Sequence, residues 1–205
     1  MSQYYELRTY QLRNGVPGKM PSGKPAGYAG TFGAFTSFIA ENSPFMTLLL
    51  TYNSFAEAEK VDEKLADVTG YIRYERTILR AFSGMPELKL PPRGNHIFEV
   101  RTYESNDAVT LQRKIDMFNN GEMQIFQRLG MNPVFFGEAL VGSKLPHLTY
   151  MLAFDDLASR DKLWKAFGSD PEWQKLRSKP GLSDADIVSN ISNSLIRPTA
   201  FSDIR

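Results

Sequence analysis

The side chain best suited to proton transfer in this sequence is His147, one of two histidines in 205 residues. An imidazole titrates near neutral pH and can act as a general base. His147 opens a strand-like stretch. The other histidine, His96, lies at the edge of a segment rich in proline and glycine, so we expect it at the surface. The competing interpretation of His147 is a histidine that is merely hydrogen-bonded at a strand end.

A second set of candidates follows one face of a strand. Side chains alternate along 98–103, which separates an apolar face from the polar set Glu99, Arg101 and Tyr103. If the apolar face packs on helices, the polar set lines the interior between two sheets, where charges need partners. Arg101 could then hold an anionic substrate with Glu99 or Tyr103 as acid or base, and Glu138 could join them. An ionic ladder that only stabilises the interior is the alternative.

Two tryptophans, Trp164 and Trp173, fall in helical sequence and could wall a substrate pocket between helices and sheet, with ordinary core positions as the alternative. The two histidines are far apart and cysteine is absent. No cluster with metal-ligand spacing results, so we predict no metal site and no cofactor.

The elements that must position these residues occur twice. Four pairs of similar stretches appear in the same order in both halves: 5–10 with 98–103, 44–47 with 146–149, 54–56 with 156–158, and 78–80 with 195–197. A fixed order of matches is typical of an internal duplication. The matching places His147 opposite Phe45, so an apolar residue stands where the second half has its histidine.

The second half predicts a complete unit. Its expected elements are a strand at 96–104, a helix ending before Gly130, strands at 133–141 and 147–154, a helix capped by Asp156 that buries Leu163 and Phe167, a helix started by Asp170-Pro171-Glu172, and a strand at 187–197. This order is typical of a ferredoxin-like split βαβ plan, an antiparallel sheet with helices on one face.

The first half departs from this plan. Between its first two strands, 13–30 holds three prolines and several glycines, so its first helix is missing. Ser54 and Glu57 begin its remaining helix as a capping box. We therefore predict a degenerate half at 1–83, a linker at 84–95 and a complete half at 96–205.

These stretches carry a resemblance to the NIPSNAP family, within the dimeric α/β-barrel superfamily. The opening strand 5–10 is similar to the first strand of that family, and the region from His147 to 174 is similar to its closing segment. The resemblance implies an α+β fold of tandem ferredoxin-like units, with antiparallel sheets packed face to face as in a dimeric α/β barrel. It also implies relatives that include cofactor-independent monooxygenases, isomerases and lyases, so fold analogy does not choose a reaction.

Composition excludes some classes of function. The formal net charge of +1 leaves no basic excess for nucleic acid. No apolar run is long enough to span a bilayer, and the missing cysteines fit a cytoplasmic protein.

Two functions remain as alternatives. The first is a small-molecule-binding protein, or cofactor-independent enzyme, whose site lies in the second half. The second is an interaction module or scaffold, for which a homodimer is one arrangement. Its candidate surface is a set of aromatic residues in the first half: Tyr28, Phe32, Phe35, Phe38 and Phe45.

Overall fold

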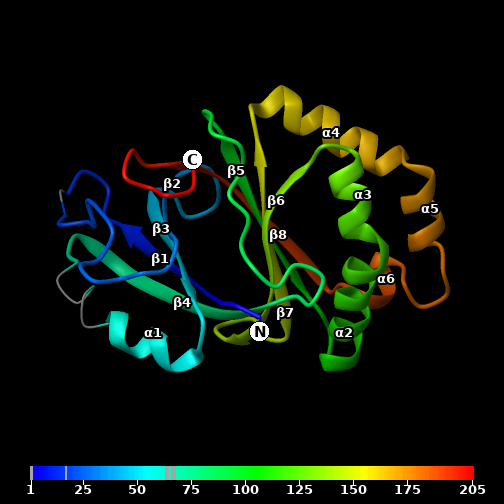
Figure 1. Cartoon of the computed structure of the whole chain (residues 1–205), viewed down its shortest axis with the longest axis horizontal. Coiled ribbons are helices and arrows are strands. Elements are labelled where there is room, and N and C mark those ends of the chain that lie inside the picture. The colour runs from blue at the N-terminus through cyan, green and yellow to red at the C-terminus, as the bar shows by residue number, and fades with distance from the viewer. Residues whose placement is uncertain (1, 17, 63–64, 66–67) are drawn as a thin grey trace.

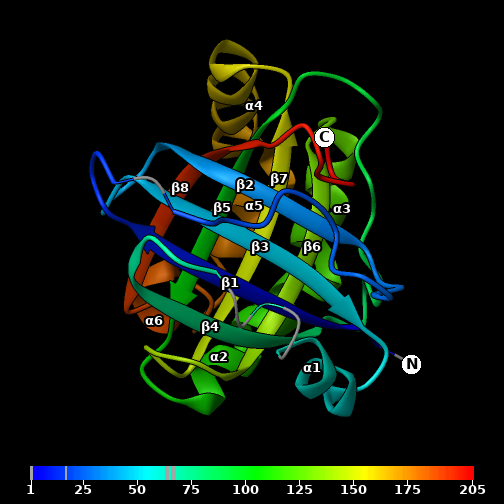
Figure 2. The same cartoon turned by 90° about the vertical axis from the view of Figure 1, so that its left-hand side faces the viewer.

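A computed structural model describes residues 2–16, 18–62, 65 and 68–205 of the chain. In this described part, eight antiparallel strands close into a barrel (Figures 1 and 2). The strands are β1 Tyr4–Leu12, β2 Phe32–Ile39, β3 Phe45–Tyr52, β4 Tyr71–Ala81, β5 Ile97–Glu104, β6 Asn132–Val141, β7 His147–Phe154 and β8 Asn190–Pro198.

The strand order around the barrel is β1-β3-β2-β8-β5-β7-β6-β4. The four strands of each half are therefore neighbours, and both halves follow the same internal order, β4-β1-β3-β2 and β8-β5-β7-β6. The halves join where β2 pairs with β8 and where β4 pairs with β6. A single chain thus closes the barrel by itself.

The helices are distributed unequally (Figure 1). Outside β5–β8 lie α2 Ala108–Met117, a π-helical segment Phe118–Glu122, α3 Met123–Arg128, α4 Leu157–Ser169, α5 Pro171–Arg177 and α6 Asp184–Ile187. The sheet of the first half has α1 Phe55–Asp62, while the described residues of 13–30 form turns and bends. No helix in the described part is both long and apolar enough to cross a membrane.

The helix boundaries in the second half follow the predicted caps. The Asp156 carboxylate accepts a hydrogen bond from the backbone N–H of Ser159 at 2.7 Å, and α4 starts at the next residue after the cap. Asp170 accepts from the N–H groups of Glu172 and Trp173 with Pro171 in the first turn. Each carboxylate satisfies donors that the first helical turn leaves free.

The predicted faces of β5 are reversed in the structure. The inward face of β5 is the apolar one, and Phe98 belongs to the cluster inside the barrel together with residues of both sheets. Tyr103 belongs instead to the cluster between sheet and helices, and Glu99 bonds to Arg160 of α4. The prediction that Glu99, Arg101 and Tyr103 line the barrel interior is therefore wrong. The narrow interior of an eight-stranded barrel is filled by aromatic side chains, whereas α4 supplies the donors that a buried carboxylate needs.

The aromatic residues of the first half do not form an exposed patch. Phe32 and Phe35 are fully buried and Phe45 is 7% exposed. Tyr28 and Phe38 are partly buried, and the Tyr28 hydroxyl lies 2.6 Å from the carbonyl oxygen of Thr51. The chain covers this region itself, because the loop and the last residues fold over β2. The interaction surface predicted from these residues is absent.

Candidate functional site

One end of the barrel interior is hollow. A cavity of about 730 Å³, here called the barrel mouth, opens between the ends of the strands. Its size lies within the range of small-molecule sites. The wall is rich in hydroxyl groups, contributed by Thr9, Thr47, Thr77, Thr102, Thr149 and Ser192.

The mouth arises from a change of residue type along the inward face of each strand. On β5 the inward side chains run from Phe98 through Val100 to Thr102. On β7 they run from Met151 through Thr149 to His147 in the reverse direction, because the strands are antiparallel. Apolar side chains fill one end of the barrel and hydroxyl groups surround a cavity at the other. Alternation along the strands brings these residues from distant positions to one wall.

His147 lies on this wall and is 4% exposed. Its Nδ1 atom is 3.4 Å from the Thr149 hydroxyl, which is 2.9 Å from the Thr102 hydroxyl. Burial lowers the pKa of His147, and contacts to the backbone of Leu148 and to Glu104 oppose part of this shift. The imidazole is therefore neutral at neutral pH and can accept a proton. The two hydroxyls form a short hydrogen-bonded chain that leads from the base.

The first half keeps the hydroxyl pair without the base. The Thr9 and Thr47 hydroxyls are 2.9 Å apart, the same separation as in the other half. Phe45, the counterpart of His147, also lines the mouth. The mouth thus has two similar sides, of which one carries an imidazole.

The other predicted catalytic residues lie elsewhere, in a network between the sheet and α4. Glu99 is fully buried, and its carboxylate accepts hydrogen bonds from Arg160 Nε at 2.8 Å, Trp164 Nε1 at 2.8 Å and Arg101 Nη1 at 2.9 Å. Burial would raise the pKa of Glu99, but the donors of Arg160 and Trp164 outweigh it and lower the pKa. Arg101 also stacks on Trp164, 4.6 Å from the ring centroid. The Glu99 carboxylate therefore holds α4 against the sheet through hydrogen bonds from Arg160 and Trp164.

Tyr103 and Trp173 belong to the aromatic core beneath α2 and α5. The Tyr103 hydroxyl is 3.0 Å from that of Tyr150. The Lys114 ammonium lies 5.3 Å from the Trp173 ring and bonds to the Glu122 carboxylate at 3.0 Å. Burial alone would lower the pKa of Lys114, but the neighbouring Glu122 and Tyr103 outweigh it and raise that pKa, whereas burial raises the pKa of Glu122 in spite of Lys114.

The sequence interpretation missed the Lys114–Glu122 pair. A signal was present, because Lys114 falls three residues after Leu111, on the apolar stripe of α2 that also contains Ile115. A charged residue in such a stripe indicates a buried partner. Glu122 is the last residue of the π-helical segment, where α-helical spacing no longer predicts its face.

Glu138 occupies a third location. Its carboxylate bonds to Arg80 at 2.6 Å, where β6 pairs with β4. The predicted residues are therefore not one constellation. The structure brings Glu99, Arg101 and Trp164 together under α4 and leaves His147 separate, in the barrel mouth.

Comparison with known proteins gives a family and a fold. The NIPSNAP family model matches residues 98–203, just over half of the chain. No curated protein matches the sequence.

Three similar solved structures cover different shares of the chain. One is a candidate monooxygenase from Lactobacillus acidophilus NCFM, with a TM-score of 0.61 and 7% identity over 97% of this chain and 94% of that chain. An anthrone oxidase-like protein has a TM-score of 0.58 and 8% identity over 97% of this chain and 92% of that chain. A NIPSNAP family protein from Agrobacterium tumefaciens strain C58 has 21% identity over 58% of this chain and 99% of that chain, with a TM-score of 0.48. The first two likenesses show that both halves together form a known barrel fold.

Proposed function

The chain belongs to the NIPSNAP family, and on that premise we propose that its barrel mouth binds a small oxygen-bearing organic molecule from which His147 removes a proton. One observation carries the proposal. A buried imidazole with a lowered pKa lines a cavity of about 730 Å³ and touches a chain of hydroxyl groups. A neutral base in a partly dry cavity is suited to general-base catalysis near neutral pH.

The wall chemistry supports a neutral, oxygen-bearing ligand. The threonine hydroxyls can donate to or accept from carbonyl and hydroxyl groups. The charged residues stand at the rim, where the side chains of Arg73, Glu75 and Lys144 are 52%, 63% and 58% exposed. Deprotonation next to a carbonyl gives an enolate, from which isomerisation, elimination and reaction with dioxygen can each proceed. A single proton transfer thus serves the three reaction types that the fold family includes.

Anthrone is a suitable probe, because it is a neutral ketone with an acidic methylene group and because an anthrone oxidase-like protein shares the fold. Deuterium exchange at that methylene, followed by NMR in D2O under nitrogen, measures proton removal without any oxidation. We expect exchange with the wild-type protein to be about 10²–10⁴ times faster than with His147→Phe. Phenylalanine is the residue that the first half uses at this position, so it should fit the wall.

Matched threonine variants sharpen this test. Thr149→Val removes the hydroxyl beside His147 and should slow the exchange, whereas Thr47→Val alters the opposite side of the mouth and should slow it less. Equal exchange in wild type and His147→Phe would contradict the role of His147 as a base. Admitting air to the wild-type reaction then tests oxygenation, through oxygen uptake that depends on the same histidine.

We infer that the barrel is a duplicated ferredoxin-like unit with the boundaries 1–83, 84–95 and 96–205. The identical strand order of the two halves supports this, as does the equivalent register of Thr9 opposite Thr47 and Thr102 opposite Thr149. Expression of 96–205 alone tests the boundary. The isolated half should associate into a symmetric dimer, because one sheet face would otherwise be exposed to water.

A collar of apolar side chains around the mouth supports a second candidate function, the formation of a homodimer. Its members at the mouth end are Ile39, Ile72, Val141, Leu145 and Ile191, each between 41% and 61% exposed. Two mouths facing each other would cover both collars. Sedimentation velocity at micromolar concentration should show a dimer that Ile39→Ser with Ile191→Ser weakens, and a monomer in the wild type would contradict this candidate.

A further inference from the structure

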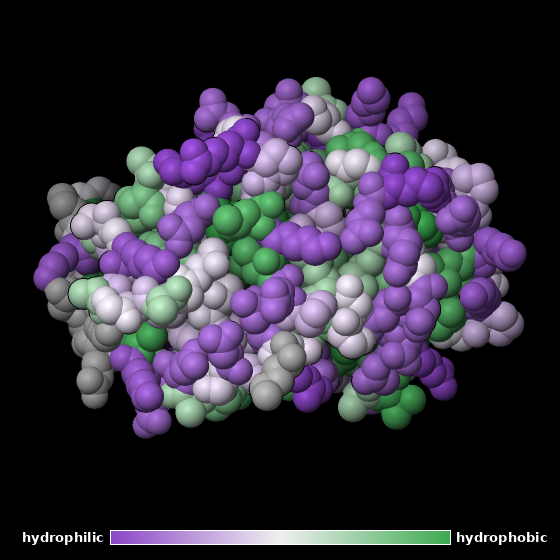
Figure 3. All heavy atoms as spheres, viewed as in Figure 1, coloured by the Kyte–Doolittle hydropathy of each residue, from purple (hydrophilic) through white to green (hydrophobic). Residues whose placement is uncertain are grey.

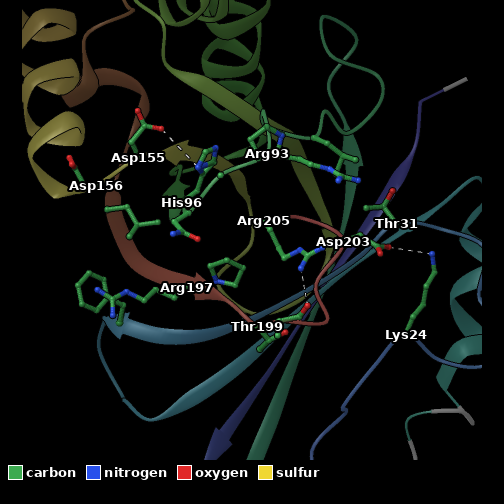
Figure 4. A pocket seen from close by; sticks show the side chains of 18 of the residues that line it. Lys24, Thr31, Arg93, His96, Asp155, Asp156, Arg197, Thr199, Asp203 and Arg205 are labelled. Carbon is green, nitrogen blue, oxygen red and sulfur yellow. Dashed lines mark hydrogen bonds and ion pairs between the residues drawn. The ribbon is translucent and has the colours of Figure 1, made fainter.

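A second cavity lies at the end of the barrel opposite the mouth. This cleft of about 1310 Å³ is bounded by the linker, the start of α4, the end of β8 and the last residues of the chain (Figure 4). Arg197 at the end of β8 lines the cleft, whereas Asn190 at the start of the same strand lines the mouth. Ile196, the residue before Arg197, lines the mouth from inside the barrel, so the two cavities adjoin opposite faces of β8 and are separate sites.

The charged side chains of the cleft are of both signs: Lys24, Arg93, Arg197 and Arg205 are basic, and Asp155, Asp156 and Asp203 are acidic. Arg93, Arg197 and Arg205 have no carboxylate within ion-pair distance among the residues that the structure describes. Lys24 pairs with Asp203 at 3.3 Å. Three guanidinium groups at one hollow without a carboxylate partner can donate hydrogen bonds to an anion; Arg205 also donates to the carbonyl oxygen of Ala200 at 3.1 Å.

His96 gives the second, independent indication of a ligand. It was expected at the surface, but it is 8% exposed and lies in the wall of the cleft. Neither ring nitrogen has a hydrogen-bond partner in the described part of the chain, and Nδ1 is 4.0 Å from the nearest Asp155 oxygen. The Thr199 hydroxyl in the same wall also lacks one. Buried polar groups without partners are costly, so donors and acceptors aimed at one cavity indicate a bound group.

The arrangement of these side chains separates a polar centre from an apolar end. Figure 4 shows Arg93, His96 and Arg205 around the middle of the cleft. The Arg197 guanidinium lies away from them, 3.6 Å above the centroid of the Phe38 ring. Leu90, 57% exposed, adds apolar wall from the linker. Figure 3 likewise shows hydrophobic residues near the centre of this face of the molecule, between hydrophilic ones.

We propose that this cleft binds an organic anion, whose carboxylate, phosphate or sulfonate group lies between Arg93 and Arg205 beside His96, and whose apolar body lies along Leu90 and Phe38. Guanidinium groups suit such an anion because each can donate two parallel hydrogen bonds to it. Thr199 and His96 supply further hydrogen bonds to oxygen atoms. The volume exceeds what a bare inorganic anion needs, which favours a ligand with an apolar body.

The test uses the full chain and 8-anilinonaphthalene-1-sulfonate, a fluorescent probe that joins a sulfonate to an apolar ring system. We expect saturable binding of one probe per chain. Arg93→Gln combined with Arg205→Gln should weaken it by about tenfold or more, whereas Arg113→Gln, an exposed arginine of α2, should leave it unchanged. The neutral analogue N-phenyl-1-naphthylamine should bind more weakly than the sulfonate. Equal binding of the two probes, or equal loss in both arginine variants, overturns the proposal.

The two histidines provide a readout of location. In NMR spectra of the imidazole rings, the probe should shift the resonances of His96 and leave those of His147 in place. Binding that leaves His96 unmoved, or that shifts His147 instead, overturns the assignment of the cleft. Competition by decanoate identifies a carboxylate site and competition by decyl phosphate a phosphate site, and failure of both overturns the proposal. These results are independent of the anthrone experiment, which measures only proton removal in the barrel mouth.

Discussion

Replacing Glu99 by glutamine tests whether a buried carboxylate fastens α4 to the sheet. In the wild type this carboxylate is fully buried and accepts hydrogen bonds from Arg101, Arg160 and Trp164. Glutamine has nearly the same size but no charge, and it offers one acceptor oxygen in place of two. Its amide group would also direct hydrogen atoms toward the guanidinium groups. The variant therefore leaves Arg101 without its counter-ion, whereas Arg160 keeps the Asp161 carboxylate at 2.8 Å.

The expected loss of stability follows from the burial of those arginines. Removing one partner of a buried ion pair costs about 3–5 kcal/mol. The side chains of Arg101 and Arg160 are 16% and 20% exposed, so water reaches part of each and the lower end applies, about 3 kcal/mol. For a chain of this length 1 kcal/mol corresponds to roughly 2–4 °C in Tm, so Tm should fall by roughly 6–12 °C.

Urea denaturation followed by tryptophan fluorescence and by circular dichroism measures the loss, and hydrogen exchange measures its location. Glu6→Gln is the matched control, because Glu6 is equally buried and bonds to Arg8 and Tyr52 in the other half. Both variants should lose stability, but only Glu99→Gln should speed exchange in 157–169. A loss below about 1 kcal/mol, or equal exchange of α4 in the two variants, would refute the reasoning.

Three further predictions concern single positions. The folded-state pKa of His147 is lowered, so the unfolded chain binds a proton more readily and the free energy of unfolding falls as pH drops below about 6.5. His147→Phe should remove this fall in urea titrations across that range, and an unchanged pH dependence would contradict the lowered pKa. Trp164→Phe removes one of two donors, each at 2.8 Å, from a Glu99 oxygen and should lower the free energy of unfolding by about 1–3 kcal/mol in the same assay; a neutral effect would mean that water replaces the indole. Lys114→Met leaves the buried Glu122 side chain without its partner and should lower the free energy of unfolding by about 3–5 kcal/mol. The double variant Lys114→Met with Glu122→Met should recover a large part of this loss. A double variant as unstable as the single one would refute the pairing.

Much of the fold could be predicted from local patterns. Strand alternation gave the position of β5 to within one residue, and the caps at Asp156 and Asp170 gave the starts of two helices. These features depend on neighbours in sequence, whose geometry is fixed by the backbone. The prolines between 13 and 30 likewise excluded a helix. Proline has no backbone N–H to donate and its ring clashes with the preceding helical turn, and both effects depend only on the local sequence.

The candidate site was only partly predictable. His147 was a candidate because of its type and its place in the repeat, and the cavity beside it was not visible in the sequence. Thr102 and Thr149 were part of the repeated stretches, but nothing local indicates that their hydroxyls face each other across two strands. His96 was misjudged because its position next to a loop does not reveal that the C-terminal residues and α4 meet around it.

The sequence by itself determined the order of the strands and the two opposite faces of each strand, since both follow from spacing along the chain. Only the tertiary structure decided which face points inward. Glu99 lies under α4 because Arg160 and Trp164 stabilise its charge there, and the apolar cluster around Phe98 inside the barrel offers no such cationic donors. The same closure left hydroxyl groups around one end of the barrel and unpaired cations around the other, which is where we expect the ligands to bind.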